Sequence, residues 1–253
     1  MLLHNLKRNK NIKIALMCMT KDEDHYLEEW ILYHLKLGFD DIIIYQNDYR
    51  SNISHPNLKK YIFDGSAVQI YAHNHFLNSN TNNYDWVAFF DVDEYLVLKK
   101  HKNIKDFVKE YINFNAIAIN WVLFGDNGIE KINNNYSLIK RFTKRENKIN
   151  IHVKTILKCN SNSIMYIHNP LCNWIDTNKN IGSGPFNHNG SIEIAQLNHY
   201  FCKTKEEFKI KIDKGRADML EKRTMSEFDI HNFNEIEDLL AYNFMYGEDD
   251  KNV

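Results

Sequence analysis

Residues that interrupt regular structure are scarce in this sequence, which has only 3 prolines and 9 glycines among 253 residues. This scarcity argues against low-complexity linkers, and no internal repeat is visible. Cysteine is also sparse, and no two of the four residues form a C-x-x-C pair: Cys18, Cys159, Cys172 and Cys202. Their spacing argues against a disulfide framework or a cysteine zinc site and indicates reduced thiols.

Neither a strong charge of one sign nor a long apolar run is present. The formal net charge is −1, so no global field points to nucleic acid. No segment approaches the ~20 apolar residues that span a bilayer, and residues 1–10 lack the apolar region of a signal peptide. We therefore expect a cytoplasmic protein, whose basic start leaves open a peripheral association with the inner face of the membrane.

Short apolar runs alternate with helical periodicity in the first hundred residues. Leu27, Trp30, Ile31 and His34 recur at helical spacing, and Gly38 supplies a stop. Each apolar run ends in polar residues, which is typical of a parallel, doubly wound α/β sheet. The expected strands are 12–19, 41–45, 61–63 and 86–90, and the expected helices are 24–38 and 67–79, with a loop or short helix over 49–60.

The second half predicts further strands, one long loop and two late helices. The loop at 176–191 is rich in Gly, Asn and Ser and is a candidate lid. A helix begins after Thr204, which forms a capping box with Glu207, and Leu220 supplies one of its apolar positions. The other expected elements are a helix over 104–113, strands over 116–124, 138–142, 150–158 and 164–168, and a last helix over 234–246.

The strand at 86–90 runs directly into three carboxylates, Asp91, Asp93 and Glu94. A buried strand cannot hold such charges without compensation, so they should lie at its carboxyl end, where open α/β sheets bind ligands. Strand alternation would place Asp91 and Asp93 on one face and Glu94 on the other. Two oxygen donors side by side suit a divalent cation; the alternative is a solvated acidic turn.

Several stretches taken in order resemble the GT-A glycosyltransferases of the family 2 and family 92 type, the latter formerly domain of unknown function 23. The resemblance covers roughly residues 12–220. It is carried by residues 19–23 (MTKDE), 27–30 (LEEW), 33–34 (YH), 44–47 (IYQN), 85–86 (DW), 91–96 (DVDEYL), 121–125 (WVLFG), 141–143 (RFT), 152–156 (HVKTI) and 199–200 (HY), with Lys203, Glu207, Phe208, Lys214 and Gly215.

The resemblance implies a single GT-A domain of the α/β class, with a Rossmann-like nucleotide-binding half, a mostly parallel central sheet and a mixed acceptor-side half. It also implies a nucleotide-diphosphate sugar donor, Mn²⁺ or Mg²⁺, and inversion at the anomeric carbon. On this reading the chain divides into a basic tail (1–11), a domain (12–246) and an acidic tail (247–253). Within the domain we expect a nucleotide-sugar-binding half (12–98), an acceptor-side half (99–225) and a C-terminal helix (226–246).

By the same resemblance, Asp93 is the direct metal ligand, and Asp91 reaches the ribose or a metal-bound water. His199 matches a position that often supplies a further ligand, although it could be a packed histidine beside Tyr200. Lys154 and Lys203 could pair with the diphosphate or be ordinary solvated lysines. The nucleoside is expected across the ends of the first strands, near Thr20, Lys21, Glu23, Asn47, Asp48 and Asp64, each of which could instead be a capping or turn residue.

The general base must reach the acceptor hydroxyl and be ionised. Asp126, in the glycine turn at 125–128, is one candidate, although the family pattern often has a small hydroxyl residue there. Glu94 is the alternative and Glu130 a poorer one. Trp121 could be an acceptor-sugar platform or a core residue.

The function that we expect is metal-dependent transfer from a UDP-sugar to a glycan or lipid-linked glycan in cell-surface polysaccharide or glycoconjugate synthesis. Galactose, or another hexose, is a guess from the resemblance alone. Two alternatives stay open. Residues 89–93 also resemble the nucleophile strand of haloacid-dehalogenase-type phosphatases, with Asp91 as nucleophile, and a non-catalytic carbohydrate-binding protein is the other possibility.

Overall fold

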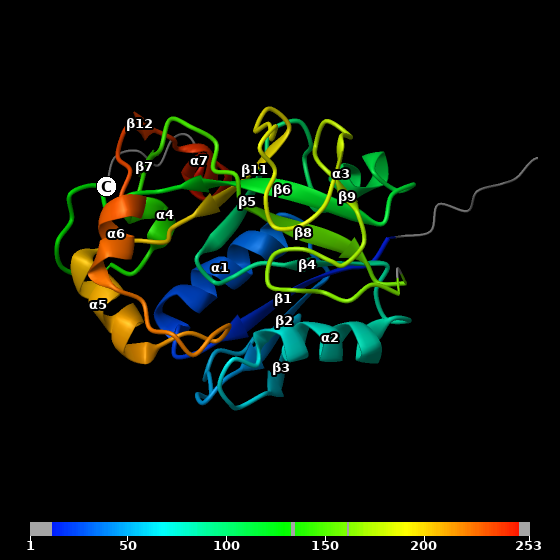
Figure 1. Ribbon diagram of the computed structural model, residues 1–253, viewed down its shortest axis with the longest axis horizontal. Coiled ribbons are helices and arrows are strands. Elements are labelled where there is room, and N and C mark those ends of the chain that lie inside the picture. Colours follow the sequence, from blue (N-terminus) through cyan, green and yellow to red (C-terminus); the bar gives the residue numbers. More distant parts are fainter. Residues whose placement is uncertain (1–11, 133–134, 161, 248–253) are drawn as a thin grey trace, which may run out of the picture.

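The computed structural model describes residues 12–132, 135–160 and 162–247 (Figure 1). Within that part, ten strands form one mixed sheet and two more form a small separate sheet. The predicted tail at 1–11 and residues 248–253 of the acidic tail lie outside the described residues. None of the helices in the described part is both long and apolar enough to cross a membrane.

The first half forms a parallel sheet with a helix on each face, as the apolar runs predict. Alternate residues of its central strand pack in opposite directions, Leu16 in the core cluster of Trp30 and Met17 in that of Phe76. Its elements are β1 (Ile14–Thr20), α1 (Asp24–Lys36), β2 (Asp41–Gln46), β3 (Leu58–Ile62), α2 (Gln69–Asn80) and β4 (Trp86–Phe89). The strand order β4-β1-β2-β3 is parallel throughout. No helix separates β2 from β3.

At the acidic end of β4 the chain turns instead of continuing as a strand. The Glu94 N–H donates to the Asp91 carbonyl at 2.9 Å, and a new strand, β5 (Glu94–Leu98), begins there. The predicted alternation of Asp91 and Asp93 on one strand face is therefore wrong. Because the two carboxylates lie on a turn, each can face a different part of the molecule.

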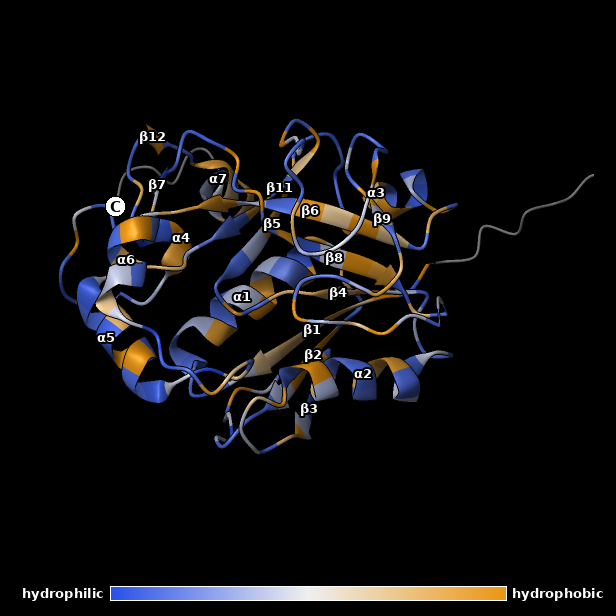
Figure 2. Ribbon diagram, viewed as in Figure 1, coloured by the Kyte–Doolittle hydropathy of each residue, from blue (hydrophilic) through white to orange (hydrophobic). Residues whose placement is uncertain are grey.

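The second half extends the sheet with strands of both directions, which confirms the expected mixed half. Its elements are α3 (Ile104–Glu110), β6 (Ala116–Leu123), β8 (Val153–Lys158), β9 (Trp174–Ile175), β10 (Ile181–Gly182) and β11 (Ala195–His199). The full order is β10-β9-β6-β8-β4-β1-β2-β3, and β11 joins β5 to β6. β8 lies antiparallel between β4 and β6 and so unites the halves. Figure 2 colours long stretches of β6 and β8 as hydrophobic, in keeping with their central place.

Several predicted elements of this half are wrong. Residues 138–142 form a short helix, α4 (Leu138–Arg141), whose first turn is capped because the Ser137 side chain accepts the Lys140 N–H. Residues 164–168 contribute only an isolated bridge between Met165 and Pro170. The predicted lid at 176–191 lies along β6 instead, where Asn187 and Asn120 bond to each other.

The helices after β11 are shorter and more numerous than predicted. α5 (Lys205–Lys214) begins with the expected capping box of Thr204 and Glu207, but Leu220 is 79% exposed and belongs to no core. A helix that the sequence analysis missed, α6 (Met225–His231), follows. The last helix, α7 (Leu240–Tyr246), is preceded by β12 (Ile236–Glu237), which pairs with β7 (Lys144–Arg145).

Candidate functional site

A pocket opens at the carboxyl ends of β1 and β4, as the sheet topology predicts. Its walls come from the ends of these strands, from β11, and from the end of α5 with the segment that follows. Six residues that the sequence analysis singled out line it: Lys21, Glu23, Asp91, Asp93, Trp121 and His199. The chain thus gathers groups from residues 21 to 199 around one cavity.

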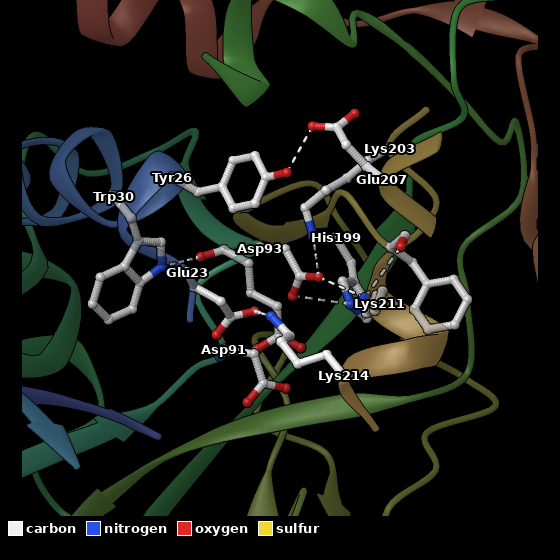
Figure 3. A network of polar contacts seen from close by, with 12 residues as sticks. Glu23, Tyr26, Trp30, Asp91, Asp93, His199, Lys203, Glu207, Lys211 and Lys214 are labelled. Atoms are coloured by element: carbon white, nitrogen blue, oxygen red, sulfur yellow. Dashed lines mark hydrogen bonds and ion pairs between the residues drawn. The ribbon is translucent and has the colours of Figure 1, made fainter. Parts of the chain in front are cut away.

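Asp93 is the most heavily contacted carboxylate of the pocket (Figure 3). Its Oδ2 accepts hydrogen bonds from Lys203 Nζ at 2.9 Å and from Lys211 Nζ at 2.8 Å. Its Oδ1 lies 3.5 Å from His199 Nε2. Burial alone would raise the pKa of Asp93, but the two lysines and His199 hold that pKa well below its ordinary value. Asp93 is therefore ionised in the interior.

Asp91 faces a different lysine. Lys154 Nζ donates to Asp91 Oδ2 at 2.7 Å, and Gln69 Nε2 donates to Oδ1 at 3.2 Å. Burial opposes ionisation of Asp91, but Lys154 outweighs it and lowers the pKa of this carboxyl. The Lys154 side chain is only 1% exposed, and although burial favours its neutral form, Asp91 and Glu94 raise its pKa. Both predicted diphosphate lysines, Lys154 and Lys203, thus contact the Asp91–Asp93 turn.

Glu94 lies beneath this turn and does not line the pocket. It is 0% exposed, and its Oε2 accepts the Asp91 N–H at 2.8 Å. Burial raises the pKa of Glu94 well above its ordinary value. A carboxyl that is fully buried, outside the pocket lining, and bonded to the backbone of the turn is a positioning group, so this geometry argues against Glu94 as the general base.

Asp126 also lies away from the pocket. Its Oδ1 accepts hydrogen bonds from the Gly128 N–H at 2.9 Å and from Asn234 Nδ2 at 3.1 Å. The turn needs these contacts because Asn127 and Gly128 both have positive φ, 52° and 76°. Asp126 therefore secures the turn against the C-terminal segment. Glu130 is exposed and is not part of the pocket lining either.

The residues predicted to bind the nucleoside fall into two groups. Lys21 and Glu23 line the pocket, whereas Asp48 and Asp64 lie in an exposed cluster beside it, where Lys21 pairs with Asp48 at 3.3 Å and Arg50 pairs with Asp64. The other two, Thr20 and Asn47, are buried, and Thr20 Oγ1 and Asn47 Oδ1 have no hydrogen-bond partner among the described residues.

The sequence analysis missed most of the cations on the α5 side. Lys211 is partly buried, with a side chain that is 13% exposed, and burial lowers its pKa to about 8 although Asp93 opposes that shift. Lys214 pairs with Glu23 at 3.3 Å, and Arg216 and Arg223 follow on the pocket wall. The spacing of Lys211 and Lys214, three residues apart on a helix that starts just after Lys203, was the available signal that they share a face.

Trp121 lines the pocket among histidines and also packs against the main core cluster. Its ring centroid is 4.3 Å from that of His199 and 5.2 Å from that of His168, and it stacks on His152 at 4.9 Å. His168 lines the pocket and was not singled out from the sequence. The place of Trp121 agrees with the predicted acceptor platform, which no observation tests directly.

The predicted metal ligands fit a divalent cation only in part. Among the described residues no three His, Cys, Asp or Glu side chains are placed to hold a metal ion by themselves. Asp93 Oδ1 and His199 Nε2 are neighbours, and burial lowers the pKa of His199 to about 4, which keeps its ring neutral and able to ligate. Mg²⁺ commonly uses one or two side chains together with water and substrate phosphates. The Asp93–His199 pair fits such an ion, while Asp91 is engaged by Lys154.

A comparison with protein-family models matches residues 54–236 to glycosyltransferase family 92. Among curated proteins, a family 92 protein of Ricinus communis is 24% identical over 140 residues, covering 50% of this chain and 25% of that protein. One from Oryza sativa subsp. japonica is 25% identical over 113 residues, covering 41% and 19%. The aligned part therefore spans a quarter or less of the length of these relatives. The family match includes Asp91, Asp93 and His199.

Among solved structures, HddC from Yersinia pseudotuberculosis is 12% identical with a TM-score of 0.34, covering 57% of this chain and 76% of that one. The WbbM bifunctional glycosyltransferase is 14% identical with a TM-score of 0.34, covering 61% and 33%. The fold assignment rests on the strand order and the mixed sheet described above.

Proposed function

Since the chain belongs to glycosyltransferase family 92, we propose that it transfers a sugar from a nucleotide-diphosphate sugar to a hydroxyl group of a glycan. Sugar transfer must stabilise the negative charge that develops on the departing diphosphate. Family membership favours this function over the phosphatase and over the non-catalytic carbohydrate-binding protein.

The observation that carries the proposal is the set of cations around the Asp91–Asp93 turn. Lys154 contacts Asp91, and Lys203 and Lys211 contact Asp93, all within 2.7–2.9 Å. Of these three lysines only Lys211 lines the pocket, together with four other cations, namely Lys21, Lys214, Arg216 and Arg223. Ammonium and guanidinium groups so placed suit phosphate oxygens.

We extend the proposal to a divalent cation, Mn²⁺ or Mg²⁺. Asp93 and His199 would hold it, and Asp91 would serve the donor through a water or the ribose. When bound, such an ion acts as a Lewis acid on the diphosphate oxygens. The lysines that line the pocket would hold the phosphates. Glu94 fixes the position of the turn by accepting the Asp91 N–H.

The finer assignments rest on the family resemblance. They are a UDP-hexose donor, with galactose as the first sugar to test, inversion at the anomeric carbon, and a glycan or lipid-linked glycan acceptor. We further propose that the reaction belongs to cell-surface polysaccharide or glycoconjugate synthesis at the cytoplasmic face of a membrane. Thr20, Lys21, Glu23 and Asn47 are the proposed nucleoside contacts.

The direct test is a panel of UDP-sugars incubated with Mn²⁺, with Mg²⁺ or with chelator, with released UDP as the readout. We expect release that chelator removes and that Asp93→Ala lowers by several orders of magnitude. Asp229→Asn is the matched control, because Asp229 is exposed on α6 and does not line the pocket. Titration calorimetry with UDP and Mn²⁺ should show weaker binding to Asp93→Ala. Turnover that persists in chelator would contradict the metal assignment, and a protein that binds no nucleotide sugar would contradict the function.

A further inference from the structure

An inverting transfer needs a group that takes the proton of the acceptor hydroxyl, and both predicted carboxylates lie elsewhere. Glu94 is buried beneath the turn, and Asp126 is bound to Gly128 and Asn234 in its own turn. A general base has to lie within hydrogen-bond reach of the reacting hydroxyl. The base must therefore be sought among the groups that line the pocket.

Most proton acceptors of the pocket wall are already engaged. Glu23 pairs with Lys214, and the two aspartates of the turn pair with lysines. His168 and Asp218 also line the pocket, and the buried His168 Nδ1 has no hydrogen-bond partner within the described residues. His199 is paired with Asp93 through Nε2 and is proposed as a metal ligand, so His168 and Asp218 are the candidates that remain.

The neighbours of the two candidates differ. Asp218 lies on the segment that also carries Arg216 and Arg223, the cations proposed to face the diphosphate. The Asp218 carboxylate would compete with the departing diphosphate for the same two arginines. His168 instead stands edge-on to Trp121, with ring centroids 5.2 Å apart, and an aromatic face is where a sugar ring packs. The acceptor sugar is therefore placed at the part of the pocket wall that holds Trp121 and His168.

The rings around Trp121 also lack polar partners. Trp121 Nε1, His168 Nδ1 and His199 Nδ1 are all buried, and none has a hydrogen-bond partner in the described part of the chain. Buried polar atoms in native proteins are nearly always paired. Three such atoms on adjoining rings indicate a place where a hydroxyl-bearing ligand or ordered water completes the hydrogen bonds.

From this geometry we propose that His168 is the general base of the transfer and that Trp121 beside it is the platform of the acceptor sugar. The inference rests on the proposed function. In the step, the acceptor oxygen forms a bond to the anomeric carbon while the bond from that carbon to the diphosphate oxygen breaks. The bonding electrons leave with the diphosphate, and the hydroxyl proton passes to an imidazole nitrogen of His168, which later releases it to solvent.

The charges around His168 are compatible with this role. Burial and the nearby Lys154 lower the pKa of His168 to about 3, with Asp91, His152 and His199 as the other titratable groups facing it. The ring is thus neutral and free to accept a proton before the donor binds. The negative charge of a diphosphate bound in the pocket raises the pKa of His168 from this low value.

The test uses the full chain with His168→Ala, a UDP-hexose, and water or simple methyl hexopyranosides as acceptors. Loss of a general base typically costs about 10²- to 10⁴-fold in rate, so we expect UDP release to fall by at least a hundredfold while UDP binding by calorimetry is unchanged. Imidazole added to the buffer should restore part of the rate. Azide, which attacks without losing a proton, should react with the donor in His168→Ala as fast as in the wild type.

Several results would overturn the inference. One is an unchanged rate in His168→Ala. Another is a loss of rate that neither imidazole nor azide restores, which would mark a structural role. A third is a loss confined to Asp218→Asn, the comparison variant, which would identify that carboxylate as the base. Wild-type protein that neither binds nor turns over a UDP-sugar would overturn the proposed function itself, together with this inference.

Discussion

Lys211 and Asp93 form a partly buried ion pair in which Nζ lies 2.8 Å from Oδ2, although 118 residues separate them in sequence. A second ammonium group, from Lys203, contacts the same oxygen at 2.9 Å. Two cations on one carboxylate leave a local surplus of positive charge, which is the condition for recruiting an anion. The ion pair thus joins the turn after β4 to helix α5.

Lys211→Met should weaken UDP binding by about tenfold or more, because a charge-assisted hydrogen bond contributes roughly 1.5–3 kcal/mol. The matched control is Lys209→Met on the exposed part of the same helix, which should leave the affinity unchanged. Calorimetric titration of UDP with Mn²⁺ measures both variants. Equal affinities would show that Lys211 serves only to neutralise Asp93.

The buried pair of Arg141 and Glu207 should govern acid stability. The guanidinium donates to both carboxylate oxygens, at 2.7 and 2.9 Å. Burial alone would raise the pKa of Glu207, but Arg141 outweighs it and lowers that pKa to about 2. The stability from this shift is complete above pH ~4.5 and is lost as the pH falls toward 2, since the folded state binds the proton later than the unfolded state.

Glu207→Gln should therefore unfold more easily at pH 7 and show a flatter decline in stability between pH ~4.5 and 2. The lowered pKa of Glu207 corresponds to about 3 kcal/mol in the free energy of unfolding at neutral pH. Urea denaturation across this range is the measurement. Parallel acid profiles for the wild type and the variant would show that other carboxylates control the transition.

Much of the fold could be predicted from local patterns. The apolar runs of β1, β2 and β4 bury residues on both faces, and a short run of this kind has few alternatives to a central strand. The capping box of Thr204 is likewise a local signal. Part of the site was predictable from the same local patterns. Polar residues at the ends of parallel strands meet at one edge of the sheet, and Asp91, Asp93 and Lys21 therefore line one pocket.

The predictions failed where contacts between residues far apart in sequence determine the local structure or the partner of a side chain. Leu138 and Ile139 have a strand-like composition, yet a short helix starts there, where the distant Glu29 accepts the Leu138 N–H at 2.9 Å. Lys203 and Lys211 meet Asp93 only because β11 pairs with β5, a pairing that no spacing in the sequence reveals. His168 lies in an irregular segment without periodicity, so only the folded chain places it beside Trp121.

Asp126→Asn tests the base that the sequence analysis favoured. An amide oxygen at position 126 can still accept the hydrogen bonds from Gly128 and Asn234, so we expect UDP release within about twofold of the wild type and a small loss of stability. Initial rates and a thermal melt measure these quantities. A rate loss of about a hundredfold or more with the fold intact would restore Asp126 as the base and contradict its placement outside the pocket.

Glu146→Gln should stabilise the protein at pH 8 and have no effect near pH 4. Glu146 is 6% exposed, its Oε1 accepts the Leu123 N–H at 3.0 Å, and burial raises its pKa to about 7. Because the unfolded carboxyl ionises near pH 4.5, the wild type loses stability as the pH rises from there toward 7, by about 3 kcal/mol at most. The amide keeps the hydrogen bond to Leu123 without the buried charge. Urea denaturation at the two pH values measures the difference, and a variant that is less stable than the wild type at pH 8 would mean that the charged carboxylate makes a favourable contact there.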